Sequence, residues 1–337
     1  MAGWDLSVGE CNTNEISEDE FWMVMNRFFT SQSKKTTTYK FCLLKCLIDN
    51  IFNVEDDLSI SYDMIFSRFT EIYWNLIVKY ELKQLVPSVR TPQSKIESIM
   101  NMFVNVNNIP QFIPFEKLGN DLKTNLSKEI QKAAQRYVVG AFYSDTHGKI
   151  FGFSKKSCRI VFNASSFKYL MKHKKAIEKM NYFEWMKFLS KTNMEDSGIS
   201  IAEKLDFSSK RYNLNQYRNF LLNETKVTKC FYCGNDLTNK NEVDHYIPWS
   251  FIKDDKTWNF VISCRMCNNS KSNSLTVKGY LNNIVKRNDD LLNNFGRNEI
   301  IKKEFNGYTN DKLFKVYEIA EFSGLISGWK PRQSVIY

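Results

Sequence analysis

The sequence predicts an α+β protein that is mostly helical, with a small central β-hairpin and a zinc-binding ββα unit near its C-terminus. Three observations lead to this class. Residues 1 to about 135 repeat apolar residues at helical intervals, residues 137–162 change to a strand pattern, and residues 230–267 carry two Cys-x-x-Cys pairs. We therefore expect two domains, 1–205 and 206–337, each with its own core.

The composition indicates a cytoplasmic protein with an excess of basic residues. The 337 residues are 43% hydrophobic and carry a formal net charge of +10. No run of 18 apolar residues occurs and the N-terminus is polar and acidic, so we expect neither a membrane span nor a signal peptide. Cysteines stay reduced in the cytoplasm, so those outside the two pairs are expected to be mostly buried thiols: Cys11, Cys42, Cys46 and Cys158.

The N-terminal region is expected to be a helical domain. Ser17 and Glu20 form a capping-box pattern that predicts a helix over residues 18–29. Apolar residues at spacings of three and four predict three more helices, over residues 37–52, 62–80 and 95–104. We interpret the many aromatic residues on these helices as core.

The periodicity changes near the middle of the chain. Residues 137–143, 149–153 and 157–162 alternate or cluster β-branched and aromatic residues, and Gly148 lies in the turn between the first two segments. We expect a small antiparallel sheet here.

Most of the positive charge lies in one segment, residues 149–191. Eleven Lys and Arg residues stand there against two Glu residues, a local balance of +9. On a helix predicted from Ser165 onward, four lysines follow the helical repeat: Lys168, Lys172, Lys175 and Lys179. This basic patch is expected to contact nucleic acid phosphates without reading sequence, although a solvated helix face would show the same pattern.

The C-terminal region combines two short strands with helices. Residues 201–205 and 212–223 are expected to be helical, and residues 241–247 and 259–263 to be strands around a loop. A helix is expected to begin at Asn268, which completes a ββα unit. Two further helices are predicted by apolar spacing, over residues 277–295 and 311–322.

The two cysteine pairs predict a structural zinc site. Cys230 and Cys233 form one pair, Cys264 and Cys267 form the other, and 30 residues separate them. Thiolates two residues apart can share one tetrahedral Zn²⁺ ion, because a tight knuckle points both sulfur atoms the same way. We expect a unit this small not to fold without its metal.

The segment from residue 230 to residue 275 resembles the HNH nuclease family. The sequences CFYCG, VDHYIPWS, WNFVISC and CRMCNNSK match in order the zinc-stapled branch of that family, which includes a phage junction-resolving endonuclease and bacterial restriction and defence nucleases. The resemblance implies a ββα-metal domain with its core at residues 226–276. It also implies that the four cysteines bind zinc.

The same resemblance assigns roles to four polar residues. Asp244 and Asn268 match the protein ligands of a catalytic divalent cation, His245 matches the general base, and Asn259 matches the residue that holds the loop. Asn stands at position 268 where many family members have a third His; both residues occur in the family.

The chemistry of these residue types fits phosphodiester hydrolysis. A neutral imidazole can activate water at neutral pH. Carboxylate and amide oxygens suit Mg²⁺ or Mn²⁺, which act as Lewis acid and leaving-group stabiliser. The hypothesis requires His245 to converge with Asp244 and Asn268 on one phosphate.

Each residue also has a structural interpretation. The four cysteines would equally form a zinc site that stabilises a module that binds nucleic acid without cutting it. In such a module His245 would be a buried, hydrogen-bonded histidine. Asn259 would cap a loop, and Asn268 would cap a helix. Lys271 would contact a phosphate or lie on the ordinary surface.

We expect a metal-dependent endonuclease that cuts DNA, with RNA as the other possible substrate, in bacterial restriction or antiviral defence. Double-strand cleavage would require a homodimer or two sequential nicks. The helical region would supply DNA contacts or regulation, or would dock a partner such as an ATPase or a sensor without which the nuclease is silent.

Overall fold

The computed structural model divides the chain into two compact units, Met1–Arg211 and Tyr212–Tyr337. It describes residues 5–86, 91–109, 111–193, 200–208, 214–223, 225–237, 241–296 and 298–332. The division falls six residues after the expected position, 205/206, because helix α9 (Ile201–Ser208) packs on helix α8 of unit 1. Within those ranges, none of the helices combines the length and the hydropathy that a membrane span requires.

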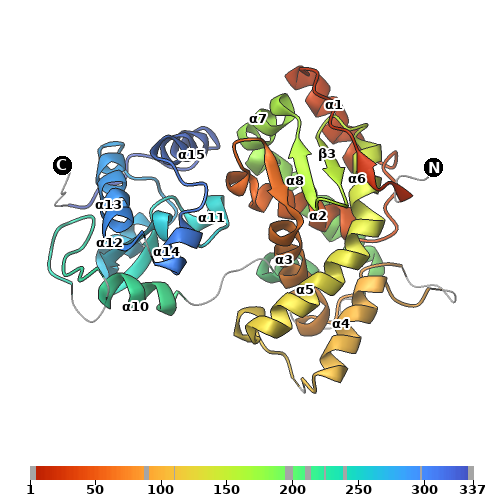
Figure 1. Cartoon of the computed structure of the whole chain (residues 1–337), viewed down its shortest axis with the longest axis horizontal. Coiled ribbons are helices and arrows are strands. Elements are labelled where there is room, and N and C mark those ends of the chain that lie inside the picture. The colour runs from red at the N-terminus through yellow and green to blue at the C-terminus, as the bar shows by residue number, and fades with distance from the viewer. Residues whose placement is uncertain are drawn as a thin grey trace. The chain divides into compact units, whose positions relative to one another are not determined.

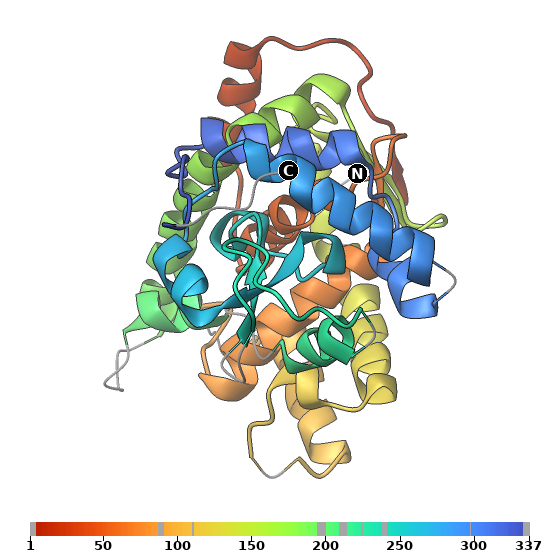
Figure 2. The ribbon, with the colours of Figure 1, turned by 90° about the vertical axis from the view of Figure 1, so that its left-hand side faces the viewer.

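Unit 1 is built mainly from helices; the capping pattern predicted the one that begins at residue 18, the apolar spacing predicted those over residues 37–52, 62–80 and 95–104, and no separate helix was predicted over residues 120–134. The longer ones at its N-terminal end are α1 (Glu18–Phe29), α2 (Tyr39–Asp49), α3 (Tyr62–Tyr73), α4 (Lys95–Val106) and α5 (Asn120–Ala134). Short 3-10 and π segments extend or join them: Ile51–Asn53, Trp74–Lys79, Phe115–Lys117 and Gln135–Val139. The Ser17 hydroxyl accepts the Glu20 backbone N–H at the start of α1, as the capping pattern predicted. Helix α5 lies beside α3 and α4 (Figures 1 and 2).

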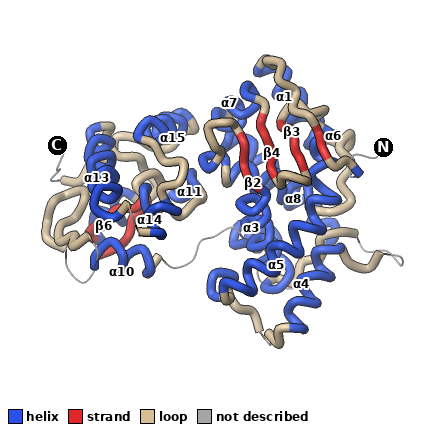
Figure 3. Tube along the Cα trace, viewed as in Figure 1, coloured by secondary structure: helices blue, strands red, loops and turns tan. Residues whose placement is uncertain are grey.

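A four-stranded antiparallel sheet completes unit 1. Strands β3 (Phe151–Ser154) and β4 (Arg159–Phe162) form the predicted hairpin, with Phe153 opposite Ile160. Strands β1 (Val8–Gly9) and β2 (Ser59–Ser61) flank it in the order β1-β3-β4-β2 (Figure 3). These two outer strands are too short to show an alternating pattern, so the sequence did not predict them.

The predicted strand at residues 137–143 is wrong. That segment continues the direction of α5 as the π segment Gln135–Val139 and helix α6 (Gly140–Asp145). Its apolar residues Val138, Val139 and Phe142 are fully buried. Tyr137 is 43% exposed, but a run this short has too few buried positions to show a periodicity that distinguishes a strand from a helix.

The single lysine-bearing helix predicted from Ser165 is divided in two. Helix α7 (Ala164–Lys172) ends at His173, whose φ is −104° and ψ 16°, and α8 (Lys174–Thr192) begins after it. Glu18 of α1 contacts this break, at 2.6 Å from both Lys172 Nζ and His173 Nε2. Lys168 and Lys172 therefore lie on one helix and Lys175 and Lys179 on the next, and they do not form one continuous stripe.

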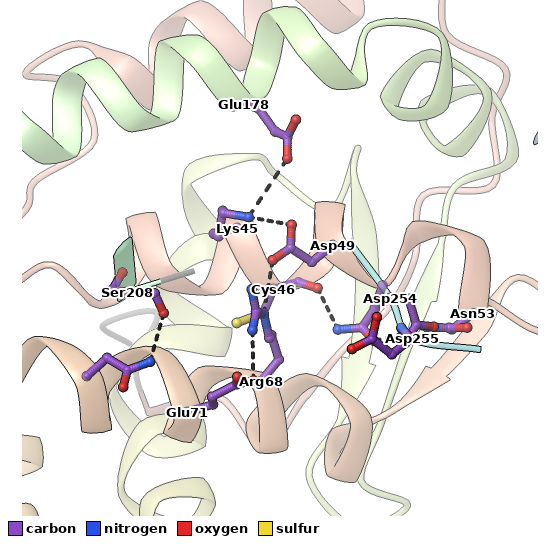
Figure 4. Close-up of polar contacts among 12 residues, drawn as sticks. Lys45, Cys46, Asp49, Asn53, Arg68, Glu71, Glu178, Ser208, Asp254 and Asp255 are labelled. Atoms are coloured by element: carbon purple, nitrogen blue, oxygen red, sulfur yellow. Dashed lines mark hydrogen bonds and ion pairs between the residues drawn. The ribbon is translucent and has the colours of Figure 1, made fainter. Parts of the chain in front are cut away.

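A buried network of charges connects α2, α3 and α8. Asp49, which is 2% exposed, accepts Lys45 Nζ at 2.5 Å and Arg68 Nε at 3.2 Å (Figure 4). Arg68 also pairs with Glu71 at 2.7 Å, and Glu178 of α8 lies 3.8 Å from Lys45. Each of these acids faces a base, so the charges are compensated inside the helical core.

Unit 2 is a ββα unit surrounded by helices. Strands β5 (Asn241–His245) and β6 (Phe260–Cys264) pair antiparallel with Val243 opposite Ile262, and helix α12 (Arg265–Lys271) packs against both strands. Helix α12 begins three residues before the expected start at Asn268. The remaining helical elements are α10 (Asn215–Asn223), α11 (Trp249–Ile252), the 3-10 segment Thr257–Asn259, α13 (Gly279–Phe295), α14 (Glu299–Glu304) and α15 (Asn310–Phe322). Residues 212 and 213, at the start of the helix expected over 212–223, lie outside the described residues.

Residues 326–329, near the C-terminus, pack against the rest of unit 2. The backbone of Leu275 donates to Ile326 and accepts from Trp329, at 2.8 and 3.0 Å. The Trp329 ring contacts Tyr232, and Tyr232 in turn contacts Tyr280 of α13, with ring centroids 5.1 and 5.8 Å apart. This aromatic cluster supports the loop from which the first cysteine pair projects.

Candidate metal centre and active site

The four cysteines of unit 2 converge into one cluster. The sulfur atoms of Cys230, Cys233, Cys264 and Cys267 all lie within 4.8 Å of one another. Cys233 Sγ is 3.9 Å from Cys264 Sγ. Four sulfur atoms around a tetrahedral zinc ion at about 2.3 Å would be about 3.8 Å apart. The cluster therefore has the donor atoms and the spacing of a structural zinc site.

Local backbone geometry brings the two pairs together. After Cys230 the chain turns at Gly234, whose φ of 71° favours glycine, and the Gly234 N–H donates to the Cys230 carbonyl at 2.9 Å. Cys264 is the last residue of β6 and the N-cap of α12, which places Cys267 in the first turn of that helix. The Cys264 N–H also donates to Cys230 Sγ at 3.3 Å. The cluster thus joins the loop before β5 to the junction of β6 and α12.

Asp244 is held by a buried lysine and a buried tyrosine. Its side chain, on β5, is 8% exposed, and its Oδ2 accepts the Tyr232 hydroxyl at 2.5 Å. Lys271 Nζ of α12 lies 2.9 Å from the same oxygen and donates to the His245 carbonyl at 2.7 Å. Burial, followed by the Asp244 carboxylate, raises the pKa of Tyr232 well above its ordinary value, so Tyr232 remains a hydroxyl donor.

Lys271 was expected either to contact a phosphate or to lie on the ordinary surface, and its burial in the structure fits neither expectation. Its side chain is fully buried. Lys271 follows Asn268 by three residues, so both lie on the face of α12 that packs on β5. Its ammonium group is therefore bound within the domain by Asp244 and a carbonyl oxygen.

His245 is the last residue of β5, and its ring contacts a different set of groups. The side chain is 3% exposed, and Nε2 lies 2.8 Å from Oδ1 of Asp255, in the loop that follows α11. Phe260, its partner across the hairpin, packs edge-on against the imidazole with ring centroids 4.6 Å apart. Because successive side chains of a strand point to opposite faces, the imidazole leaves β5 on the side opposite the Asp244 carboxylate.

Asn268 and Asn259 make two different kinds of contact. Asn268 is half-buried on α12, and its Nδ2 donates to Glu242 Oε2 of β5 at 2.5 Å. Asn259 is fully buried and bridges the chain beyond β5: its Oδ1 accepts the Ile247 N–H at 2.8 Å and its Nδ2 donates to the Ile247 carbonyl at 2.9 Å. The first contact lies on the Asp244 face of the hairpin, and the second fixes the loop between the strands.

One comparison with known proteins identifies this unit. The family model described as HNH endonuclease matches residues 230–277. These residues are an HNH domain. They include the four cysteines, both strands and α12, and unit 1 lies outside the match. No curated protein and no solved structure matches the chain.

The pKa values of the cysteine thiols are shifted in different directions within the cluster. Burial raises the pKa of the Cys230 and Cys267 thiols. Burial also acts to raise the pKa of Cys264, but hydrogen bonds from the Cys267 backbone and from the neighbouring thiols outweigh it, and the pKa of Cys264 is lowered. Zinc requires thiolates, so metal binding to this cluster must release protons.

The HNH domain also contains polar residues that the sequence did not single out. Glu242 and Asp244 are two residues apart on β5, so the alternation of a strand could have placed both on one face. Asp255 lies ten residues after His245 in an irregular loop, where no periodicity indicates a contact. Tyr232 lies inside the first cysteine pair, where the spacing drew attention to sulfur alone.

Proposed function

We propose that the HNH domain is a metal-dependent endonuclease that hydrolyses phosphodiester bonds of DNA. The proposal depends on one observation above all: Asp244, to which the HNH resemblance assigns the cation, contacts Lys271 of α12 and faces the same side of the hairpin as Asn268, while His245 ends the same strand. A nuclease is the activity that an HNH domain supports. The choice of DNA over RNA, and a role in bacterial restriction or antiviral defence, come from the resemblance to restriction and defence nucleases.

Asp244 and Asn268 are the residues that would hold a catalytic cation. Their oxygen donors and single negative charge fit Mg²⁺ or Mn²⁺, and such an ion, when bound, would neutralise a non-bridging phosphate oxygen and stabilise the leaving 3′ oxygen. Tyr232 and Lys271 both bind Oδ2 of Asp244. Oδ1 has no hydrogen-bond partner among the residues that the structure describes, so it is the oxygen that this chain leaves for a ligand.

His245 would remove the proton from the attacking water. If Nε2 donates to the Asp255 carboxylate, the ring proton lies on Nε2 and the lone pair on Nδ1. Asp255 would also stabilise the imidazolium that forms. The His245 ring diverges from Asp244 and contacts Asp255, so these side-chain positions do not show the convergence of His245, Asp244 and Asn268 that the sequence-based hypothesis requires. Cleavage would require the base and the oxygen ligands to reach the phosphate from two sides of the strand end.

Cleavage of supercoiled plasmid tests the proposal. We expect the wild-type protein with Mg²⁺ or Mn²⁺ to cut, and His245→Gln to lose activity by at least about 100-fold, because a general base contributes roughly 10² to 10⁴ in rate. Gln can still donate to Asp255, so the variant should fold. His147→Gln, in an exposed turn of unit 1, is the matched control and should cut like the wild type.

Two other results would replace the proposal. If the wild type binds DNA but cuts no faster than His245→Gln with any metal, the domain is a zinc-stapled binding module. If cleavage begins only when a protein that co-purifies from the native host is added, the enzyme is an effector that requires a partner.

A further inference from the structure

We infer that Glu242 is a positioning residue that orients the Asn268 carboxamide toward the catalytic cation; the inference rests on the proposed function. Glu242 lies on β5, two residues before Asp244, and Asn268 lies on α12. Their 2.5 Å hydrogen bond joins the strand to the helix on the face that carries Asp244. The HNH resemblance assigned a role to Asn268 and none to Glu242.

The chemistry of the two groups determines which way the amide points. A carboxylate has no proton to donate, so the atom of Asn268 that meets Glu242 must be the NH₂ group. The carbonyl oxygen Oδ1 is then directed away from Glu242. Without this acceptor the terminal torsion of an asparagine is broad and nearly two-fold, and either end of the amide could face a cation. Only the oxygen end can bind one.

The charge around Asp244 explains why this orientation matters. Lys271 is fully buried at 2.9 Å from the Asp244 carboxylate, so the main anionic ligand already faces a positive charge. A divalent cation would therefore depend on its other protein oxygen more strongly than the formal charge of Asp244 indicates. A carboxamide fixed in the productive orientation avoids an entropic cost when the cation binds.

The competing interpretation is that Glu242 is an ordinary surface partner of Arg265. Arg265 Nε is 4.0 Å from Glu242 Oε1, and the two side chains are 65% and 38% exposed. An ion pair with that separation and exposure contributes little. The bond to Asn268 is shorter by 1.5 Å and involves the other carboxylate oxygen, so Glu242 can serve Asn268 whether or not Arg265 is in place.

The test is Mn²⁺ binding to the full-length, zinc-loaded protein without DNA. Binding is monitored through the electron paramagnetic resonance signal of the free ion. We expect Glu242→Ala to weaken Mn²⁺ binding by about 10- to 100-fold, the usual effect of losing a residue that orients a metal ligand. Glu242→Gln should weaken it less, because its amide oxygen still accepts from Asn268. Glu321→Ala removes a carboxylate of similar exposure on α15 and should bind Mn²⁺ like the wild type.

Three comparisons decide the outcome. The difference between Glu242→Ala and Glu242→Gln should vanish when Asn268 is also Ala, which would show that Glu242 acts through the carboxamide. Equal affinities for the wild type and Glu242→Ala, or equal losses in Glu242→Ala and Glu242→Gln, would overturn the inference and leave the proposed function standing. If Asp244→Asn binds Mn²⁺ as well as the wild type, no such cation site exists, and both are overturned.

Discussion

At the scale of single residues, the HNH site is organised by a buried lysine. Lys271 neutralises Asp244 and holds the carbonyl of the next residue, His245, so one ammonium group fixes the strand end at which the proposed chemistry would occur. Removing one member of a buried ion pair leaves the other charge without compensation, which is more destabilising than losing an exposed pair. Replacing Lys271 is therefore expected to destabilise the HNH domain, and any loss of activity is expected to follow from that loss of stability.

The first prediction compares two lysines of unit 2. Lys271→Ala should lower the free energy of unfolding of unit 2 by about 3 to 5 kcal/mol, because Asp244 would remain buried without a partner. Lys278 is 65% exposed and lies 3.4 Å from Glu321, so the two form an exposed pair. Lys278→Ala should change the free energy of unfolding of unit 2 by less than about 1 kcal/mol. Urea unfolding, monitored by hydrogen exchange of the unit 2 amides, measures the change in unfolding free energy of both variants. Equal losses of unfolding free energy in the two variants would mean that the buried ion pair stabilises unit 2 no more than the exposed pair does.

At the scale of elements, the ββα unit is too small to be stable alone. Its strands have five residues each and α12 has seven. Such a unit has little apolar area to bury, and metal binding normally supplies the missing folding free energy. The cysteine cluster stands where α12 leaves β6, so the ion would fix the angle between sheet and helix.

The second prediction concerns that cluster. Cys264→Ser should reduce bound zinc from about one ion per chain to nearly none and unfold unit 2 while unit 1 keeps its helices, because a three-thiolate site forfeits most of the binding free energy. Zinc content by mass spectrometry and near-ultraviolet circular dichroism provide the measurements. Cys158→Ser, at a thiol outside the cluster in unit 1, should retain both signals. A Cys264→Ser protein that keeps its zinc would contradict a structural role for this ligand.

The third prediction concerns the buried charges between α2, α3 and α8. Burial alone would raise the pKa of Asp49, but Lys45, Arg68 and Lys174 lower it by more, so its pKa in the folded protein is below the ordinary value. The resulting stabilisation is complete above the unfolded pKa of about 3.9 and is lost as the pH falls further. Asp49→Asn should therefore lower the unfolding free energy of unit 1 by about 3 to 5 kcal/mol at pH 7.

The pH dependence distinguishes this effect from a simple loss of packing. Below about pH 4 the urea midpoint of the wild type should fall more steeply than that of Asp49→Asn, because the variant has no carboxylate at this position to protonate. Asp56→Asn, at an exposed position between α2 and α3, should follow the wild-type curve. Parallel curves for Asp49→Asn and the wild type would contradict the assignment.

The elements that the sequence predicted correctly are those with a local signal. Ser17 starts α1 because its hydroxyl caps the next turn, and each Cys-x-x-Cys knuckle needs only a tight turn to bring its own two sulfur atoms together. Residues 137–143 lacked such a signal, since a short apolar run is equally apolar in a helix and in a strand. The contact of Asp255 with His245 depends on a loop conformation, and the burial of Lys271 depends on how α12 packs on β5. Tertiary packing decides both, and no spacing along the chain encodes it.

At the scale of the whole molecule, the proposed chemistry and most of the excess charge belong to different units. The HNH domain lies in unit 2, whereas residues 149–191, with their balance of +9, lie in unit 1. Part of that charge is compensated within unit 1, because Glu18 pairs with Lys172 and Glu20 pairs with Lys149. The basic patch is therefore smaller than the sequence indicated, and its lysines should not contribute equally to binding a polyanion.

The last prediction ranks those lysines by their ion pairs. Lys168 and Lys179 are exposed, and neither has an ion pair within the part of the chain that the structure describes, whereas Lys172 is bound to Glu18. If the patch binds DNA, each phosphate contact releases counterions and contributes about 0.9 to the slope of log K against log salt concentration. The double variant Lys168→Ala with Lys179→Ala should then flatten the slope by up to about 2. Lys172→Ala should flatten it by less than 1, since the charge of Lys172 is already partly neutralised.

The double variant Lys128→Ala with Lys132→Ala is the control for net charge, because it removes the same charge from the exposed face of α5. Equal slopes for the two double variants would mean that DNA responds to the total charge of the protein and not to this patch.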